Sequence, residues 1–260
     1  MILENNRIIL DNNSIIENLG VYAVPGLILW HDASQLNIPN GTLISEISEK
    51  SGTGFNFIQS DVQRRPLNRT NVINGFGAAS LELNTVDFPV GNQGTILGSR
   101  TGSQNFFNGR VVEVFWVGRF LTPPSGVSLF YHFRSPVNPV VTIRILPSNR
   151  LSLSATDNSG NTLITTLTNT LVSNQWYIFS TLFDFTGTFN RTLTVEGVGS
   201  ISDSSVNSFT FTSSHNFRLG GSANTNTVQF AEGVIASNTA PLSLDNKNII
   251  INYFKSKYNL

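Results

Sequence analysis

The chain has 260 residues, only 12% of them charged, and its 16 basic side chains balance its 16 acidic ones. An ordinary soluble domain has roughly 25% charged residues, and a neutral chain of low charge lacks the basic surface that nucleic acid or an anionic membrane requires. The absence of cysteine excludes a disulfide framework, a cysteine-ligated zinc site and a thiol nucleophile. Hydrophobic residues reach 40%, with 19 Phe, so the chain can form a packed core.

Residues 1–24 form an apolar arm ahead of Pro25-Gly26, where a main domain of residues 25–260 is predicted to begin. The arm lacks the basic and apolar regions of a secretory signal, which predicts synthesis in a cytosol. An isolated hairpin is marginal in water, so the arm either adds an edge strand to its own sheet or docks on a neighbouring subunit. Its candidate assembly residues are Ile8, Ile9, Leu10, Ile15 and Ile16.

The main domain is dominated by β-branched and aromatic runs whose period is two. Turn formers separate the runs, because Pro presets φ while Gly, Asn and Asp tolerate positive φ. Many short strands separated by turn residues predict one all-β domain, a sandwich or a barrel. A Ser-rich stretch at residues 200–208 is predicted to be a loop. The clearest strand runs lie at residues 111–120, 127–133, 140–146, 176–185 and 191–195.

One short helix is predicted at the C-terminus. Ser243 can cap its first turn. Lys255 and Lys257 stand in its last turn, where they complement the helix dipole. Its apolar positions at helical spacing are Ile249, Ile250, Tyr253 and Phe254.

Several segments follow one another in a recognisable order. Residues 26–34 read GLILWHDAS and residues 49–54 read EKSGTG, and further matching segments lie at 65–83, 111–118, 176–197 and 217–258. In this order they resemble the laminin G-like jelly-roll branch of the concanavalin A-like lectin/glucanase superfamily, of the kind found in phage and bacterial surface proteins. The resemblance covers residues 25–260 and implies two antiparallel sheets packed as a jelly-roll sandwich, with loops along one rim.

The superfamily includes glycoside hydrolases, so catalytic carboxylates are the first function to consider. A retaining enzyme of this fold carries Glu-x-Asp-x-(x)-Glu on one strand, because alternation aims all three acids into the cleft. Here Glu113 and Asp184 stand alone in apolar strands. His31 and Asp32 are adjacent strand residues that point to opposite faces and cannot form a dyad. His31, His132 and His215 lack a G-x-S-x-G elbow and are interpreted as structural. We therefore expect no enzyme.

Jelly-roll domains of this branch often hold one calcium ion, and the resemblance places its ligands at Asp87 and Glu232. The family more often has an acid where Asn84 stands here, and a Gly where Ala231 stands. The first of these departures reduces the charge available to the ion. A structural Ca²⁺ at Asp87 and Glu232 is one expectation, and no other cofactor is expected.

Glycan binding on this fold needs polar rim loops and an aromatic ring that stacks on a sugar. Neutral amides and hydroxyls bond sugar hydroxyls without the desolvation cost of a charge. The same loops also fit ordinary β-turns, and Trp30, Trp116 and Trp176 lie in strand patterns typical of a core. The candidate glycan-binding residues are Asn105, Phe106, Phe107, Asn158, Asn161, Asn224 and Asn226.

We interpret the chain as a non-enzymatic virion protein, such as a bacteriophage tail fibre, spike or surface decoration, that binds a host glycan as an adhesin. Three features favour a virion protein: a domain type that acts outside cells but has no secretion signal, a neutral composition rich in Asn, Ser and Thr, and the apolar arm. The expected location is the virion. The expected partners are virion subunits bound through the arm, further copies in a homo-oligomer and a cell-surface glycan, but neither nucleic acid nor a membrane. A stand-alone lectin module and a glycoside hydrolase remain the alternatives.

Overall fold

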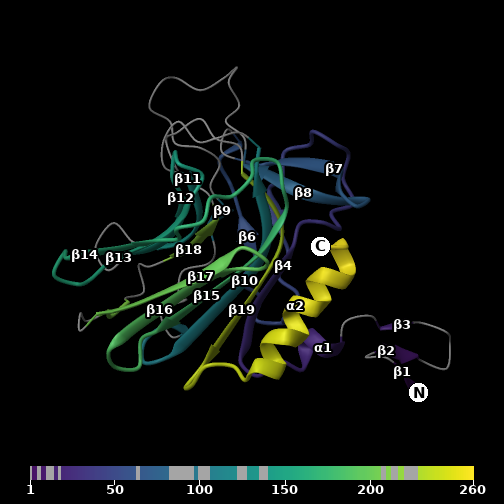
Figure 1. Ribbon diagram of the computed structural model, residues 1–260. Helices are drawn as coiled ribbons and strands as arrows, with labels where there is room; N and C mark the ends of the chain where they lie inside the picture. Colours follow the sequence, from purple (N-terminus) through teal and green to yellow (C-terminus); the bar gives the residue numbers. More distant parts are fainter. Residues whose placement is uncertain are drawn as a thin grey trace.

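The computed structural model describes residues 2–4, 7–9, 15–16, 19–62, 65–81, 97–98, 106–121, 128–134, 140–205, 209–211, 216–219 and 228–260. It consists mostly of antiparallel strands in two large sheets, with one long helix near the C-terminus (Figure 1). This confirms the predicted all-β sandwich. No helix among these residues is long and apolar enough to cross a membrane.

The first large sheet, which we call the helix-side sheet, has eight strands in the order β17-β16-β15-β10-β19-β8-β7, with β4 also pairing with β19. Its strands are β4 (Leu27–Asp32), β7 (Leu67–Ile73), β8 (Phe76–Leu81), β10 (Val111–Phe120), β15 (Tyr177–Asp184), β16 (Phe189–Val195), β17 (Gly199–Ser205) and β19 (Val228–Asn238). Strand β17 covers most of the Ser-rich stretch predicted to be a loop, so that prediction is wrong. The stretch alternates between half-buried and exposed positions, as an edge strand does.

The second sheet, which we call the opposite sheet, has eight strands in the order β14-β13-β12-β11-β18-β9-β6-β5. Its strands are β5 (Glu46–Ile47), β6 (Phe57–Ile58), β9 (Leu97–Gly98), β11 (Ser128–Arg134), β12 (Val140–Ile145), β13 (Leu151–Thr156), β14 (Thr162–Thr166) and β18 (Asn216–Leu219).

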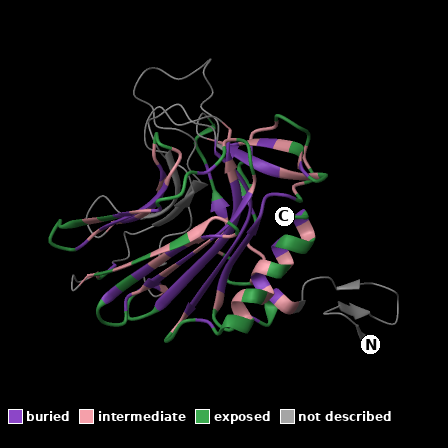
Figure 2. Cartoon of the chain, in the orientation of Figure 1, coloured by how far each residue is buried: buried purple, intermediate pink, exposed green. Residues whose placement is uncertain are grey.

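The main core lies between the two sheets (Figure 2). Trp116 of β10 is fully buried there and stacks on Phe179 of β15 with ring centroids 4.9 Å apart. Nearly every residue of β10 is buried, on both of its faces. The reason is that the strand packs against the opposite sheet on one side and beneath the C-terminal helix on the other. Burial on both faces explains why its sequence is an almost continuous apolar run.

The C-terminal helix α2 (Leu244–Tyr258) covers the outer face of the helix-side sheet (Figure 1). As predicted, Ser243 caps it, and the Ser243 side chain accepts a hydrogen bond from the Asn246 N–H. Ile250, Phe254 and Tyr258 are its buried residues. They pack in a second apolar cluster with strand residues of the sheet and with the short helix α1 (Leu19–Tyr22).

The N-terminal strands β1 (Ile2–Glu4), β2 (Arg7–Ile9) and β3 (Ile15–Ile16) pair with one another in a separate three-stranded antiparallel sheet. Among the described strands, none of the three pairs with either large sheet. The described strands of the arm therefore do not extend the sandwich as edge strands. Val21 and Val24 are buried in the cluster beneath α2, so residues 19–24 pack with the sandwich. Leu10 lies outside the described residues.

Candidate functional site

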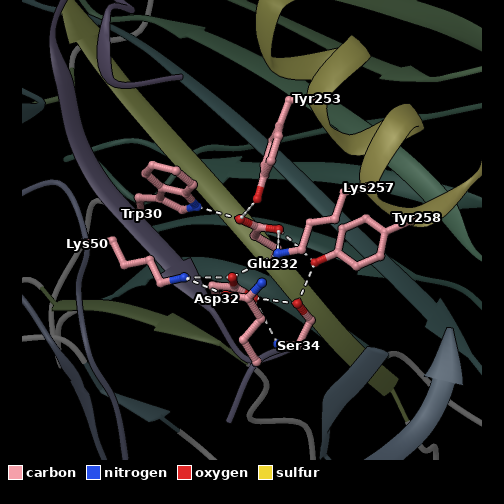
Figure 3. A network of polar contacts seen from close by, with 9 residues as sticks. Trp30, Asp32, Ser34, Lys50, Glu232, Tyr253, Lys257 and Tyr258 are labelled. Carbon is pink, nitrogen blue, oxygen red and sulfur yellow. Dashed lines mark hydrogen bonds and ion pairs between the residues drawn. The ribbon is translucent and has the colours of Figure 1, made fainter. Parts of the chain in front are cut away.

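A buried polar cluster lies where the last turn of α2 meets β4 and β19 (Figure 3). Glu232 of β19 is directly opposite Asp32 of β4, and residues paired in this way project from the same face of the sheet. The Lys257 ammonium comes from α2 and lies 2.8 Å from a carboxylate oxygen of each. The cluster as a whole consists of Trp30, Asp32, Ser34, Lys50, Glu232, Tyr253, Lys257 and Tyr258.

Both carboxylates in this cluster are saturated with donors. One Glu232 oxygen accepts hydrogen bonds from the Trp30 indole at 2.5 Å and from the Tyr253 hydroxyl at 2.8 Å. The other accepts from the Tyr258 hydroxyl at 2.7 Å as well as from Lys257. Asp32 is bonded in the same way by Ser34, Lys50 and Lys257. The Trp30 bond joins β4 to β19, and the other contacts join α2 or a nearby loop to the sheet, so the cluster holds α2 in place.

The two carboxylates titrate differently. Burial alone would raise the pKa of the Asp32 carboxyl, but Lys257 and Lys50 outweigh burial and hold that pKa below its ordinary value. For Glu232, burial and the negative charge of Asp32 outweigh Lys257, so the pKa of the Glu232 carboxyl is raised. The Lys257 ammonium is therefore the shared counter-ion of two carboxyls, one with a lowered pKa and one with a raised pKa.

This carboxylate pair does not suit sugar hydrolysis. Asp32 is 4% exposed and Glu232 is 0% exposed, and α2 covers both. A glycosidase needs one carboxyl at the glycosidic oxygen and another at the sugar ring. No sugar can reach these two without displacing the helix.

The cluster does not suit calcium either. Calcium takes 6–8 oxygen ligands, whereas Glu232 is surrounded by N–H and O–H donors and by the positive charge of Lys257. The ammonium stands between the two carboxylates, in the position that a bridging cation would need. Asp87, the other predicted ligand, lies outside the described residues. Across the described part of the chain, no group of three or more acidic or histidine residues could hold a metal ion.

The other acids that the sequence analysis singled out also have structural partners. Glu113 accepts a hydrogen bond from the Leu242 N–H at 2.5 Å and pairs with Lys247 at 2.7 Å, which ties down the start of α2. Asp184 accepts bonds from the backbone and the hydroxyl of Thr186 in the turn that follows β15.

His31 is buried at 1% exposure and faces away from Asp32. Its Nε2 lies 2.8 Å from the Phe55 carbonyl, and its ring stacks on Phe57 at 3.8 Å. Because a carbonyl can only accept, Nε2 carries the proton. These contacts agree with a structural role. The side chains of His132 and His215 are not described.

The burial of His31 predicts a pH-dependent stability. Burial lowers its pKa from 6.5 to about 4, so the unfolded chain takes up this proton first as the pH falls. His31 should therefore cost roughly 3 kcal/mol of unfolding free energy between pH 6.5 and about 4. In His31→Gln the amide can still donate a hydrogen bond to the Phe55 carbonyl, but it does not titrate. The pH-dependent loss of unfolding free energy should therefore disappear in this variant. Urea unfolding across that window measures both proteins, and equal slopes would contradict the assignment.

The structure places one of the two predicted sugar-stacking rings, Phe107, in the core. Phe107 is 1% exposed, and its ring contacts Phe211. Phe106 is half-buried and packs edge-on against Phe55. Phe107 therefore has no open face for a sugar, because its loop folds inward at this point.

The predicted loop amides are exposed but engaged. Asn158 exchanges two hydrogen bonds with the backbone of Thr210, at 3.2 and 2.8 Å. The Asn161 amide donates to Asp157 at 3.0 Å. Both therefore stabilise turns in this structure, and their binding role stays a prediction. Asn105, Asn224 and Asn226 lie outside the described residues.

A polar surface that the sequence analysis missed lies on the outer face of the opposite sheet. Along β12 the inward residues Val141, Ile143 and Ile145 are buried, while Thr142 and Arg144 alternate with them and are half-buried. We call this surface the polar face. Its accessible hydroxyls are those of Thr142, Thr156, Thr162 and Thr166, at the outward positions of three adjacent strands, while Ser152 and Ser154 on the same face are buried. The alternation of β12 was a visible signal, but it did not say which strands lie beside it.

Solved structures with the same fold are receptor-binding domains of botulinum neurotoxins. The domain of the C/D mosaic serotype is 14% identical, with a TM-score of 0.57, and the match covers 88% of this chain and 51% of that one. The serotype G binding domain is 11% identical, with a TM-score of 0.57, and the match covers 88% and 51%. The serotype D ligand-binding domain in complex with N-acetylneuraminic acid is 14% identical, with a TM-score of 0.57, and the match covers 90% and 52%.

At this level of identity the likeness defines a class of fold, the β-rich sandwich found in those binding domains. The chain spans about half the length of the neurotoxin domains that it matches. No protein-family model matches the sequence. A comparison with curated proteins also finds no match.

Proposed function

We propose that this chain is a non-enzymatic β-sandwich that binds a cell-surface glycan. The observation that carries the proposal is the fold shared with receptor-binding domains, two of which were solved with N-acetylneuraminic acid and with SialylT. A surface of neutral hydroxyls on the opposite sheet supports it, because such groups bond sugars at low desolvation cost. The buried state of Asp32 and Glu232 supports the non-enzymatic part.

A glycan array probed with the full chain tests this proposal. We expect saturable binding to a subset of glycans, lost when Thr142 and Thr166 are both replaced by valine. Replacing Thr186, a turn residue bonded to Asp184 on the other sheet, by valine is the matched control and should leave binding unchanged. Absence of binding to every glycan at high protein concentration would overturn the proposal.

We further propose that the chain acts on a virion, as a tail fibre, spike or surface decoration, with the N-terminal sheet as its anchor. The three strands pair only with one another among the described strands, and at two or three residues each they are much shorter than the usual five or six, so by themselves they make a small core. Their apolar residues therefore need a partner surface, and a second subunit would supply one. A lectin that works alone would not need the anchor.

Deleting residues 1–18 distinguishes a subunit anchored through its N-terminal sheet from a lectin that works alone. The cut leaves α1, whose Val21 is 1% exposed, so the sandwich should keep its melting temperature. We expect the full chain to be an oligomer and the truncated chain a monomer, as measured by light scattering. An unchanged oligomer after truncation, or a full chain that is already a monomer at high concentration, would contradict the anchoring role.

A further inference from the structure

One continuous row of residues crosses the whole opposite sheet. Successive pairings join eight positions, one on each strand from β14 to β5. Residues that are paired across neighbouring strands share a face, and Thr142 places the row on the outer face because Val141 and Ile143 are buried. In order, the row is Ile164, Ser154, Thr142, His132, Arg218, Gly98, Ile58 and Glu46.

Three arginines lie on or beside this row. Arg218 is in the row, Arg134 is two positions from His132, and Arg144 is two positions from Thr142. A step of two residues keeps a strand position on the same face. Strand spacings put the Cα atoms of Arg134 and Arg218 about 8 Å apart, and those of Arg144 and Arg218 about 12 Å apart.

The charge of this sheet is one-sided. Within its described strands there are three arginines and one acid, Glu46. Glu46 stands at the far edge of the row, about 14 Å from Arg218 by strand spacing, and it bonds the Asn56 amide at 2.5 Å. In a chain with only 12% charged residues, three arginine positions share one face of this sheet by strand register.

Arg144 adds a second, independent observation. Its Nε is buried and has no hydrogen-bond partner. A guanidinium keeps its charge in proteins and presents a planar fork of donors that matches a carboxylate. Its neighbours across β13 and β14 are Ser152, which is itself buried, and Thr166, which is half-buried. The face therefore offers a charged donor beside the accessible hydroxyls of Thr142 and Thr166.

We propose that the polar face binds an acidic glycan, one whose sugars carry carboxylate groups, with Arg134, Arg144 and Arg218 as its counter-charges. The inference rests on the proposed glycan-binding function and names the chemical class of its ligand. Charge-assisted hydrogen bonds from a guanidinium to a carboxylate supply the preference for acid. The accessible Thr residues of the face serve the uncharged parts of the sugars.

Calorimetric titration of the full chain with oligogalacturonate and with its methyl ester tests the charge directly, because the ester keeps the sugars and removes the negative charge. Sialyllactose and lactose form a second matched pair. We expect the acidic member of at least one pair to bind about tenfold more tightly and to lose affinity as salt is added. Arg144→Gln should remove most of this preference, and Arg144→Lys should keep part of it. Arg150→Gln, in the turn after β12, is the control.

Each outcome decides the proposal. Equal binding of the acidic and neutral sugars would overturn the acidic ligand and leave glycan binding standing. No binding of any sugar by a folded protein would overturn both. An acid preference that survives Arg144→Gln, Arg134→Gln and Arg218→Gln would place the ligand elsewhere. Equally tight binding of a poly-glutamate peptide or of single-stranded DNA would mark a general anion surface and contradict the glycan.

Discussion

Replacing Lys257 with methionine is expected to lower the free energy of unfolding by about 3–5 kcal/mol, because it leaves two buried carboxylates without their shared cation. The Lys257 side chain is 7% exposed, and its ammonium lies 2.8 Å from both Asp32 and Glu232. Without it, one carboxyl must take up a proton, so its pKa in the folded state rises. The deficit should therefore shrink as the pH is lowered, since a raised folded-state pKa favours folding below it. Urea unfolding at neutral and acid pH measures both effects.

The same helix provides the control. Lys255 pairs with Glu196 at 3.0 Å, but their side chains are 43% and 29% exposed. Exposed pairs contribute about 0–1 kcal/mol, so Lys255→Met should change little. Adding Glu232→Gln to Lys257→Met removes one of the two stranded charges and should recover part of the loss. A deficit no larger than that of Lys255→Met would contradict the role given to the cluster.

Replacing Phe254 with alanine is expected to cost about 3–5 kcal/mol, the range for a buried phenylalanine. Phe254 is 0% exposed and lies with Ile250 in the cluster between α2 and the helix-side sheet. The loss follows from the apolar contact removed and from the cavity that remains. Thermal and urea unfolding of the variant measure it.

Leu244 in the first turn of α2 is the matched control, because its side chain is 72% exposed. Leu244→Ala should change stability by at most about 0.5 kcal/mol. If both variants unfolded like the parent, α2 would be an appendage to the sandwich instead of part of its core.

The strands that cross the core could be predicted from the sequence because burial on both faces leaves a continuous apolar run. Strand β10 is the example, since nearly all of its residues are buried. The helix α2 was equally visible, with its Ser243 cap and its basic last turn. Strand β17 was not, because Ile201 is the single large apolar residue in a strand made otherwise of Gly, Ser and Asp. Pairing with β16 makes it a strand, and pairing is invisible in a local pattern.

The polar contacts were harder to predict because they join distant parts of the chain. Lys257 was identified as a helix-terminal cation, yet its partner Asp32 is 225 positions away. Phe107 was taken for a surface ring because its loop is polar, but the ring turns into the core beside Phe211. The arginines of the polar face lie on three strands that only the sheet pairing brings together.

Much of the limited charge of the chain lies in ion pairs made by the lysines of α2. Lysines of α2 take part in ion pairs with Glu113, Glu196, Asp32 and Glu232, so much of the limited charge fastens one helix to one sheet. Of these acids, Asp32, Glu113 and Glu232 are buried and thereby withdrawn from surface chemistry. The polar face is then free of nearby acids within the described strands except for Glu46.

Binding of a glycan without its cleavage can be measured by titrating the full chain with the glycan that gives the strongest array signal and then separating the same mixture by chromatography. We expect saturable binding and an intact glycan. Glycan fragments that accumulate with time, and that vanish when an acidic residue is replaced, would contradict this expectation.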